Sequence, residues 1–167
     1  MKDINVSCPE EKAEMYKLLH SQMKALLEGE HDMTANLANA SALLNEVLDN
    51  INWVGFYLLK NDELILGPFQ GKVACVRIAA GKGVCGTAVS ENKTQLVEDV
   101  HRFPGHIACD SASNSEIVIP LRCEGKVVGV LDIDSPLIGR FDTEDASGLE
   151  KLAGVIEEAC DWMQNGK

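Results

Sequence analysis

The chain has 167 residues, of which 46% are hydrophobic and 25% charged; this ordinary globular composition predicts one domain and excludes wholesale disorder and fibrous classes. Its formal net charge of −11 argues against nucleic acid or an anionic membrane as the main partner, because both attract clustered Lys and Arg. No apolar run reaches the roughly 20 residues of a membrane span and the first residues lack the apolar core of a secretory signal, so we expect a cytoplasmic protein.

Two helices are predicted before the first strand. Over residues 9–29, apolar side chains recur at spacings of three and four, and Gly29 follows as a stop. The same spacing recurs over residues 33–49, after Asp32 or Thr34 as the cap. The first helix is amphipathic, so it could cover its own sheet or pair with a second copy of the chain in a homodimer.

The segments that follow read as strands, each rich in branched or aromatic side chains and bounded by turn residues. They are residues 52–59, 63–66, 75–79, 94–100, 116–122 and 126–133. A Gly-rich segment over 81–92 is predicted to end in a short helix, and a long helix closes the chain at about 143–163, capped by Asp142 or Thr143.

This order predicts an α+β fold with a mostly antiparallel six-stranded sheet and the N- and C-terminal helices packed on one face. We expect one domain, with N-terminal helices at about 9–49, the sheet and its loops at about 52–134 and the closing helix at about 143–163. Loops longer than roughly 12 residues are uncommon and usually functional. The irregular stretch from Asp99 to Ser115 is therefore the first place to look for a site.

Three of the six cysteines are candidates for chemistry. Cys109 lies in the long loop, where a cysteine packs poorly and a reactive thiol becomes credible. Cys85 lies at the start of the predicted short helix, where backbone N–H groups lower a thiol pKa, although a small residue packed between glycines explains it equally well. Cys75 opens a strand and could point to either face. A structural role is preferred for Cys8, Cys123 and Cys160.

Three carboxylates are predicted to meet on the last hairpin. Strand alternation puts Asp132 and Asp134 on one face, and counting from the turn at 124–126 sets Asp134 opposite Glu116. Such a cluster is costly unless a cation or a shared proton relieves it, and the alternative is a solvated strand end. Trp53 and Tyr57 share a face of the first strand and form either core or an apolar wall beside a ligand.

Taken together, these residues resemble the free methionine-(R)-sulfoxide reductase family, whose members are single-domain GAF-fold enzymes. The resemblance extends from about Ala13 to Trp162. It rests on the segments NWVGFYL, GPFQGKVACVRI, GKGVCGTA, FPGHIACDSASNSEIVIPL and GVLDIDSP, with GRFD after the last. The three cysteines and three carboxylates are far more specific than a general GAF resemblance.

The resemblance implies reduction of free L-methionine (R)-S-oxide, with thioredoxin as the reductant. It implies that Cys109 is the nucleophile, that Cys85 and Cys75 are the other redox cysteines, and that an aromatic at Trp53, beside Tyr57, packs on the substrate methyl group. The carboxyls of Glu116, Asp132 and Asp134 would then bind the substrate. We prefer Cys85 as the partner of Cys109, because of its expected helix-start position.

Sulfoxide chemistry is consistent with this implication. A sulfoxide becomes a good electrophile when its oxygen is protonated, and a carboxyl whose pKa is raised by its neighbours, Glu116 or Asp134, can donate that proton near neutral pH. The remaining acids would face the ammonium of a free amino acid. The same carboxylates disfavour a thiolate. No cofactor or metal is expected, because thiols carry the electrons. The alternatives are a non-catalytic GAF sensor of a small ligand and a redox sensor.

Overall fold

The computed structural model describes residues 9–107 and 109–165. Six antiparallel strands form one sheet in the order β3-β2-β1-β6-β5-β4. The strands are β1 (Trp53–Lys60), β2 (Glu63–Gly71), β3 (Arg77–Ala79), β4 (Gln95–Val97), β5 (Ser115–Cys123) and β6 (Lys126–Ser135). The helices are α1 (Pro9–Leu27), α2 (Met33–Val47), α3 (Gly83–Glu91) and α4 (Thr143–Ala159), with 3-10 turns η1 (Val100–Arg102) and η2 (Trp162–Asn165).

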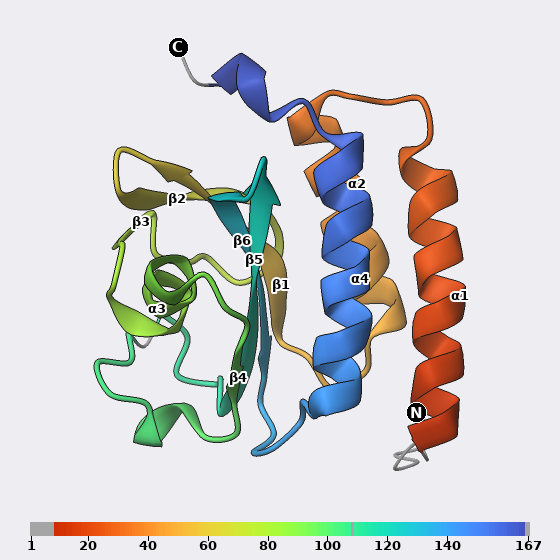
Figure 1. Ribbon diagram of the computed structural model, residues 1–167. Coiled ribbons are helices and arrows are strands. Elements are labelled where there is room, and N and C mark those ends of the chain that lie inside the picture. Colours follow the sequence, from red (N-terminus) through yellow and green to blue (C-terminus); the bar gives the residue numbers. More distant parts are fainter. Residues whose placement is uncertain (1–8, 108, 166–167) are drawn as a thin grey trace.

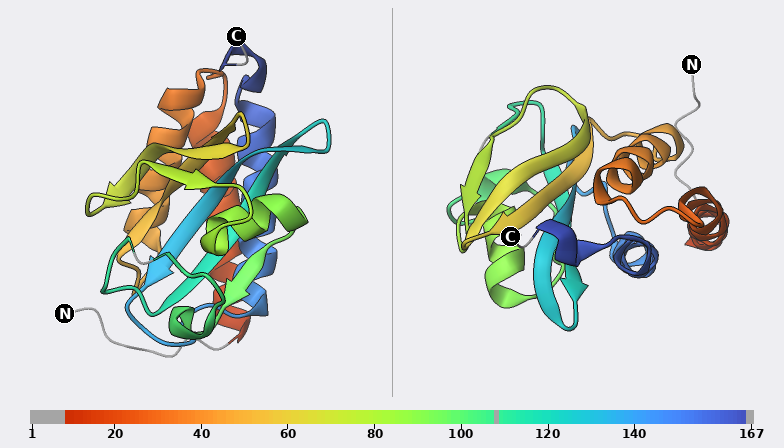
Figure 2. Two further views of the ribbon diagram at one scale, coloured as in Figure 1. Left: turned by 90° about the vertical axis from the view of Figure 1, so that its left-hand side faces the viewer. Right: turned by 90° about the horizontal axis from the view of Figure 1, so that it is seen from above.

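The helices divide between the two faces of the sheet. The N- and C-terminal helices lie on one face, with α2 and α4 against the strands and α1 outside them, whereas α3 and the long loops lie on the other (Figures 1 and 2). Because side chains alternate along β1, Val54 and Phe56 enter the core under α2 and α4, while Trp53 and Tyr57 face α3. The predicted α+β fold with helices on one face is confirmed, and α3 is the added layer that closes the site.

Capping residues fix the helix starts. Asp32 accepts a hydrogen bond from the backbone N–H of Ala35, and Asp142 forms a capping box with Asp145. Asp145 is fully buried and also accepts from the Tyr16 hydroxyl at 2.7 Å, which ties α1 to α4. Of the two caps offered at each start, Asp32 and Asp142 are therefore the ones used.

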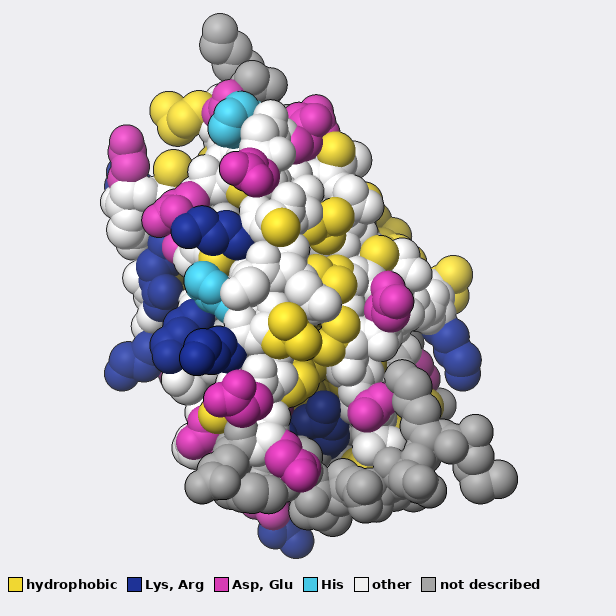
Figure 3. Space-filling view, turned by 90° about the vertical axis from the view of Figure 1, so that its right-hand side faces the viewer, with side chains coloured by type: hydrophobic (Ala, Val, Ile, Leu, Met, Phe, Trp, Pro, Cys, Tyr) yellow, Lys and Arg dark blue, Asp and Glu magenta, His cyan; other side chains and the backbone are white. Residues whose placement is uncertain are grey.

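The first helix buries one stripe against its neighbours and exposes another. Tyr16, Leu19, Met23 and Leu27 are buried in the main core, while Leu18 is 61% and Leu26 42% exposed. Figure 3, which faces α1, shows hydrophobic side chains along the middle of this face with charged side chains around them. The homodimer stays a prediction. None of the described helices is long and apolar enough to cross a membrane.

Several element ends differ from the sequence-based bounds for identifiable reasons. The strand expected at 63–66 continues to Gly71. It tolerates Pro68 because its pairing with β1 is irregular between Leu66 and Phe69 and β3 pairs only with its first three residues. The strand expected at 94–100 ends at Val97, since the Asp99 side chain accepts from His101 N–H and starts η1. The closing helix ends at Ala159 instead of continuing to 163, and η2 follows it.

The hairpin of β5 and β6 sets the register of the carboxylates. Its turn has two residues with positive φ, Glu124 at 53° and Gly125 at 77°, as a type I′ turn requires. Cys123 therefore pairs with Lys126, one residue closer to the turn than expected, and a bulge after Leu121 restores the predicted register. Glu116 then pairs with Asp134, as the sequence predicts.

Candidate active site: a cysteine and carboxylate pocket

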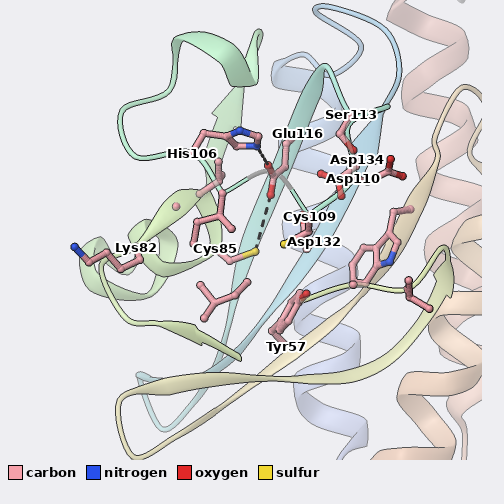
Figure 4. A pocket seen from close by; sticks show the side chains of 17 residues that line it. Tyr57, Lys82, Cys85, His106, Cys109, Asp110, Ser113, Glu116, Asp132 and Asp134 are labelled. Carbon is pink, nitrogen blue, oxygen red and sulfur yellow. Dashed lines mark hydrogen bonds and ion pairs between the residues drawn. The ribbon is translucent and has the colours of Figure 1, made fainter. Parts of the chain in front are cut away.

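A pocket lies on the α3 face of the sheet and collects residues from distant parts of the chain (Figure 4). Side chains from β1, α3, the 103–114 loop and the β5–β6 hairpin line it. The polar and aromatic ones are Trp53, Tyr57, Lys82, Cys85, His106, Cys109, Asp110, Ser113, Glu116, Asp132 and Asp134. All the sequence-predicted site residues except Cys75 thus line one pocket.

A disulfide joins Cys109 to Cys75, with their Cα atoms 5.7 Å apart. Cys75 lies in the segment between β2 and β3, and its carbonyl accepts a hydrogen bond from the Tyr57 hydroxyl at 2.9 Å. Cys109 is exposed and Cys75 half-buried, so the disulfide lies at the mouth of the pocket. The expected pairing of Cys109 with Cys85 is wrong for this structure.

Cys85 lies in the first turn of α3, as predicted, but its thiol is free and only 4% exposed. It donates to Glu116 Oε1, with the sulfur 3.9 Å from the oxygen. Burial, followed by the charges of Asp132 and Glu116, raises the pKa of this thiol well above its usual value. Desolvation therefore outweighs the helix-start effect on which the preference for Cys85 relied.

The remaining cysteines fit structural roles. Among the described residues, Cys123 and Cys160 are free, and Cys160 is buried in the main core at the end of α4. Cys8 lies outside the described residues.

The three carboxylates form a mostly buried group at the base of the pocket. Glu116 and Asp132 are each 6% exposed. Burial and then the charge of Asp132 raise the pKa of Glu116 and of Asp134 well above their usual values. Burial raises the pKa of Asp132 to about 6, and the neighbouring side chains of Glu116 and Cys85 limit this rise. Asp132 is thus the member that ionises near pH 6, while Glu116 and Asp134 keep their protons to higher pH than isolated carboxyls do.

The ligand atoms of Cys85, Glu116 and Asp132 lie within 4.8 Å of one another. Asp132 Oδ1 is buried and has no hydrogen-bond partner among the described residues. Such an oxygen is expensive to leave unpaired. The group is therefore shaped to share a proton or to meet a cation.

His106 reaches this group from the long loop. Its Nε2 atom lies 4.0 Å from Glu116 Oε2, and burial lowers its pKa below the usual 6.5. A neutral imidazole is therefore the dominant form at pH 7. The sequence shows His106 only as one of two loop histidines beside Pro104, and its distance to Glu116 depends on how the loop folds back.

Aromatic rings form the apolar wall. Trp53 stacks on Phe69 and Tyr57, with ring centroids 5.2 and 5.9 Å apart, and its indole N–H donates to the carbonyl of Lys72. A Cβ on Gly71 would lie 2.6 Å from the Trp53 ring, so only glycine admits this ring position. Trp53 and Tyr57 are buried in the core and also line the pocket. The two interpretations made from the sequence, core residue and apolar wall, therefore both apply.

The sequence does not point to three polar residues of the site, which are Asn52, Asp110 and Ser113. Asn52 donates through Nδ2 to Asp110 Oδ2 at 3.1 Å and to Ser113 Oγ at 3.0 Å. The hydrogen bond from the Ala112 N–H lowers the pKa of Asp110, so this carboxylate is ionised. In the sequence, Asn52 is predicted to be the first residue of a strand. Only the hydrogen-bonding capacity of its short amide side chain indicates a further role.

Comparisons with known proteins agree on one family. A GAF domain family model matches residues 32–161. The chain is 58% identical over 147 residues to the free methionine-R-sulfoxide reductase of Escherichia coli (strain K12), covering 88% of this chain and 89% of that protein.

Solved structures give the same result. The fRMsr of Staphylococcus aureus, in complex with substrate, matches with 60% identity and a TM-score of 0.83, covering 86% of this chain and 94% of that chain. The free methionine-R-sulfoxide reductase of Neisseria meningitidis, in complex with its substrate, matches with 45% identity and a TM-score of 0.87, covering 95% of each chain.

Proposed function

Because the chain belongs to the GAF-domain family of free methionine-R-sulfoxide reductases, we propose that it reduces free L-methionine (R)-S-oxide to L-methionine. The observation that carries this function is the pocket itself. A cysteine already joined to a second cysteine lies at its mouth, and three carboxyls that share protons lie at its base. Thiol redox chemistry and proton donation therefore act on one bound molecule.

Cys109 is the nucleophile in this proposal. Its sulfur attacks the sulfoxide sulfur, the sulfoxide oxygen ends on Cys109, and methionine leaves. The sulfoxide sulfur gains two electrons, and Cys109 passes from thiol to sulfenic acid. The thiol proton is lost as the oxygen gains one, so protons balance within the pocket. Cys109 is exposed and lines the pocket, and both facts support its assignment as the nucleophile.

Glu116 donates the proton to the sulfoxide oxygen. Its raised pKa keeps the carboxyl protonated to higher pH than an isolated glutamate, and it lines the pocket from the start of β5. Proton donation of this kind contributes roughly 10²–10⁴-fold to a rate. Asp134 is the less favoured donor, because the contacts of Cys85 and His106 converge on Glu116.

The substrate ammonium pairs with Asp132, which is the most easily ionised of the three acids. A methionine within a protein has no ammonium to place there, so the pocket favours the free amino acid. The aromatic wall of Trp53 and Tyr57 takes the apolar methyl end. Selectivity for the (R) form follows the family.

Cys75 completes the cycle. Its thiol condenses with the sulfenic acid of Cys109 to form the disulfide and release water. Thioredoxin then reduces the disulfide by thiol exchange and becomes oxidised itself. The exposed position of Cys109 supports this step, because an attacking thiol must reach one of the two sulfurs.

A coupled assay with thioredoxin, thioredoxin reductase and NADPH tests this function. We expect turnover of the free (R)-sulfoxide, and none of the (S) form or of peptide-bound sulfoxide. Cys109→Ser should abolish turnover, whereas Cys123→Ser, at a half-buried free cysteine of the hairpin, serves as the matched control and should retain it. Turnover of peptide-bound sulfoxide at the rate of the free amino acid would overturn the proposal.

A further inference from the structure

One amide side chain attaches the loop of Cys109 to the sheet. Asn52 is the last residue before β1, and its backbone N–H donates to the carbonyl of Asp134 at 2.9 Å. Its Nδ2 atom donates to Asp110 Oδ2 and to Ser113 Oγ. The amide therefore connects the carboxylate strand β6 with two residues that follow Cys109 and line the pocket.

The attached part of the loop is a compact turn. Asp110 Oδ1 accepts from the backbone N–H of Ala112 at 2.9 Å, and its carbonyl accepts from that of Ser113 at 3.2 Å. Asp110 is covalently next to Cys109, so a displacement of this turn carries Cys109 with it. The Asn52 hydrogen bonds thus help to set the distance of Cys109 from both the acids and Cys75.

The orientation of the amide is determined by its partners. Its nitrogen faces a carboxylate and a hydroxyl, while Oδ1 is buried without a partner among the described residues. Turning the amide over would direct that oxygen at the ionised Asp110. A buried acceptor without a partner is unfavourable for folding. The residue is therefore better explained by where it holds the loop than by its contribution to stability.

We propose that Asn52 is a positioning residue. By holding the turn that begins at Asp110, it keeps Cys109 over the carboxyl cluster and within reach of Cys75. The inference rests on the proposed function only in naming Cys109 as the nucleophile. When the disulfide is reduced, the Asn52 hydrogen bonds keep the loop in place. Attack needs close alignment, and a displacement of about 1 Å can lower a rate by roughly 100-fold.

A charge-swap series tests this role. Asn52→Asp puts a second carboxylate against Asp110 and should release the turn. Asp110→Asn alone keeps a weaker, neutral hydrogen bond. The double variant Asn52→Asp with Asp110→Asn restores a donor and an acceptor in exchanged places, and the amide oxygen then present at position 110 can still accept from the N–H of Ala112. Cys123→Ser is the control outside the pocket.

Two measurements separate positioning from a general structural role. The first is the rate of methionine release in a single turnover by the reduced protein. The second is the equilibrium in which the disulfide and two glutathione molecules give two protein thiols and oxidised glutathione. We expect Asn52→Asp to slow release by about 10–100-fold, with a smaller change in KM, and to shift the equilibrium toward the dithiol by about tenfold. The swap should return both values to within about threefold of wild type.

Wild-type values of both quantities in a folded Asn52→Asp variant would overturn the proposal, and so would a swap variant no better than the single one. If Asn52→Asp does not fold, recovery of folding and rate in the swap variant still decides the question. The glutathione equilibrium needs no substrate. It therefore tests Asn52 even if Cys109→Ser shows that another group is the nucleophile, which would defeat the proposed function separately.

Discussion

Glu116 lies directly opposite Asp134 on the neighbouring strands β5 and β6, and Asp132 lies two residues before Asp134 on the same face. Like charges in this relationship repel, and burial adds to the cost of ionising them. Protons relieve the repulsion, so the pKa of both Glu116 and Asp134 is raised. A register that is unfavourable for folding thereby places carboxyls of raised pKa at the base of the pocket, where the proposed mechanism needs a proton donor.

Glu116→Gln tests the donor with little change of shape. The amide cannot deliver a carboxyl proton to the sulfoxide oxygen, so we expect kcat to fall by roughly 10²–10⁴-fold. Peroxide should still form the Cys75–Cys109 disulfide, because that step does not use Glu116. Pre-steady-state methionine release and peptide mapping measure the two effects. An active Glu116→Gln enzyme would transfer the role to Asp134, for which Asp134→Asn is the matched variant.

The pH profile of kcat/KM should have a rising limb at low pH and a falling limb at high pH. Asp132, whose pKa is about 6, must be ionised to pair with the ammonium, so kcat/KM should rise with pH through about 6. Glu116 must be protonated, so kcat/KM should fall again at higher pH, as Glu116 loses its proton. Cys85 and His106 also face Glu116, and burial lowers the pKa of His106 below its usual value of 6.5, so His106 also titrates on the acidic side of neutral pH.

Variants assign the first limb. Asp132→Asn should remove it and raise KM, whereas His106→Gln should leave its midpoint in place. The dependence of kcat/KM on pH from 5 to 9 checks this. If the limb disappears in His106→Gln and persists in Asp132→Asn, Asp132 is not the ammonium partner.

The acid cluster should also make stability depend on pH. Its folded-state pKa values lie above the unfolded values of about 4, so the folded state binds more protons between them. This contribution is complete below about pH 4 and is lost as pH rises through the folded-state pKa values. Asp99, Asp110 and Asp142, with lowered pKa values, act in the opposite direction but titrate below that window. His106, whose pKa is lowered from 6.5, opposes the trend within the window, but it is one group against three carboxyls.

We therefore expect the free energy of unfolding of the wild type to fall from pH 4.5 to 7. Glu116→Gln should flatten this dependence and raise Tm at pH 7, because it removes an ionisable member of the cluster. Urea unfolding at several pH values measures both. A Glu116→Gln variant with lower Tm and the same slope would show that the cluster is not a source of instability.

Cys85 and Cys75 should differ in whether the Cys109 disulfide depends on them. Cys85→Ser should still form the Cys75–Cys109 disulfide and accept electrons from thioredoxin, because the buried Cys85 thiol is not part of it. Cys75→Ser should lose both properties. Mass mapping after oxidation and the thioredoxin assay distinguish them. A Cys85–Cys109 disulfide formed in the wild type during turnover would contradict this assignment.

The register of the carboxylates could be predicted because it depends on local information. Strand alternation and the position of one turn suffice to bring Glu116 opposite Asp134, and the bulge after Leu121 offsets the one-residue error at the turn. The helices that cover the other face follow in the same way from their apolar spacing and from caps such as Asp142.

The disulfide partner could not be predicted in this way. Cys75 lies in an irregular segment whose place depends on contacts such as the Tyr57 hydroxyl with its carbonyl. The helix start at Cys85 is visible in the sequence, but the direction of its thiol into buried carboxylates is not. The side-chain partners of Asn52 and the position of His106 depend on how the long loop folds back, which no periodicity in the sequence records.

The most direct test of the account is a single turnover by reduced Cys75→Ser protein with free L-methionine (R)-S-oxide. Without Cys75 the cycle should stop after the first step, giving one methionine per protein and one added oxygen on Cys109, captured by a sulfenic-acid reagent and located by mass spectrometry. Release of methionine with Cys109 unmodified, or equal release by the Cys75→Ser, Cys109→Ser double variant, would contradict the claim that the sulfur of Cys109 takes the oxygen beside the carboxyl cluster.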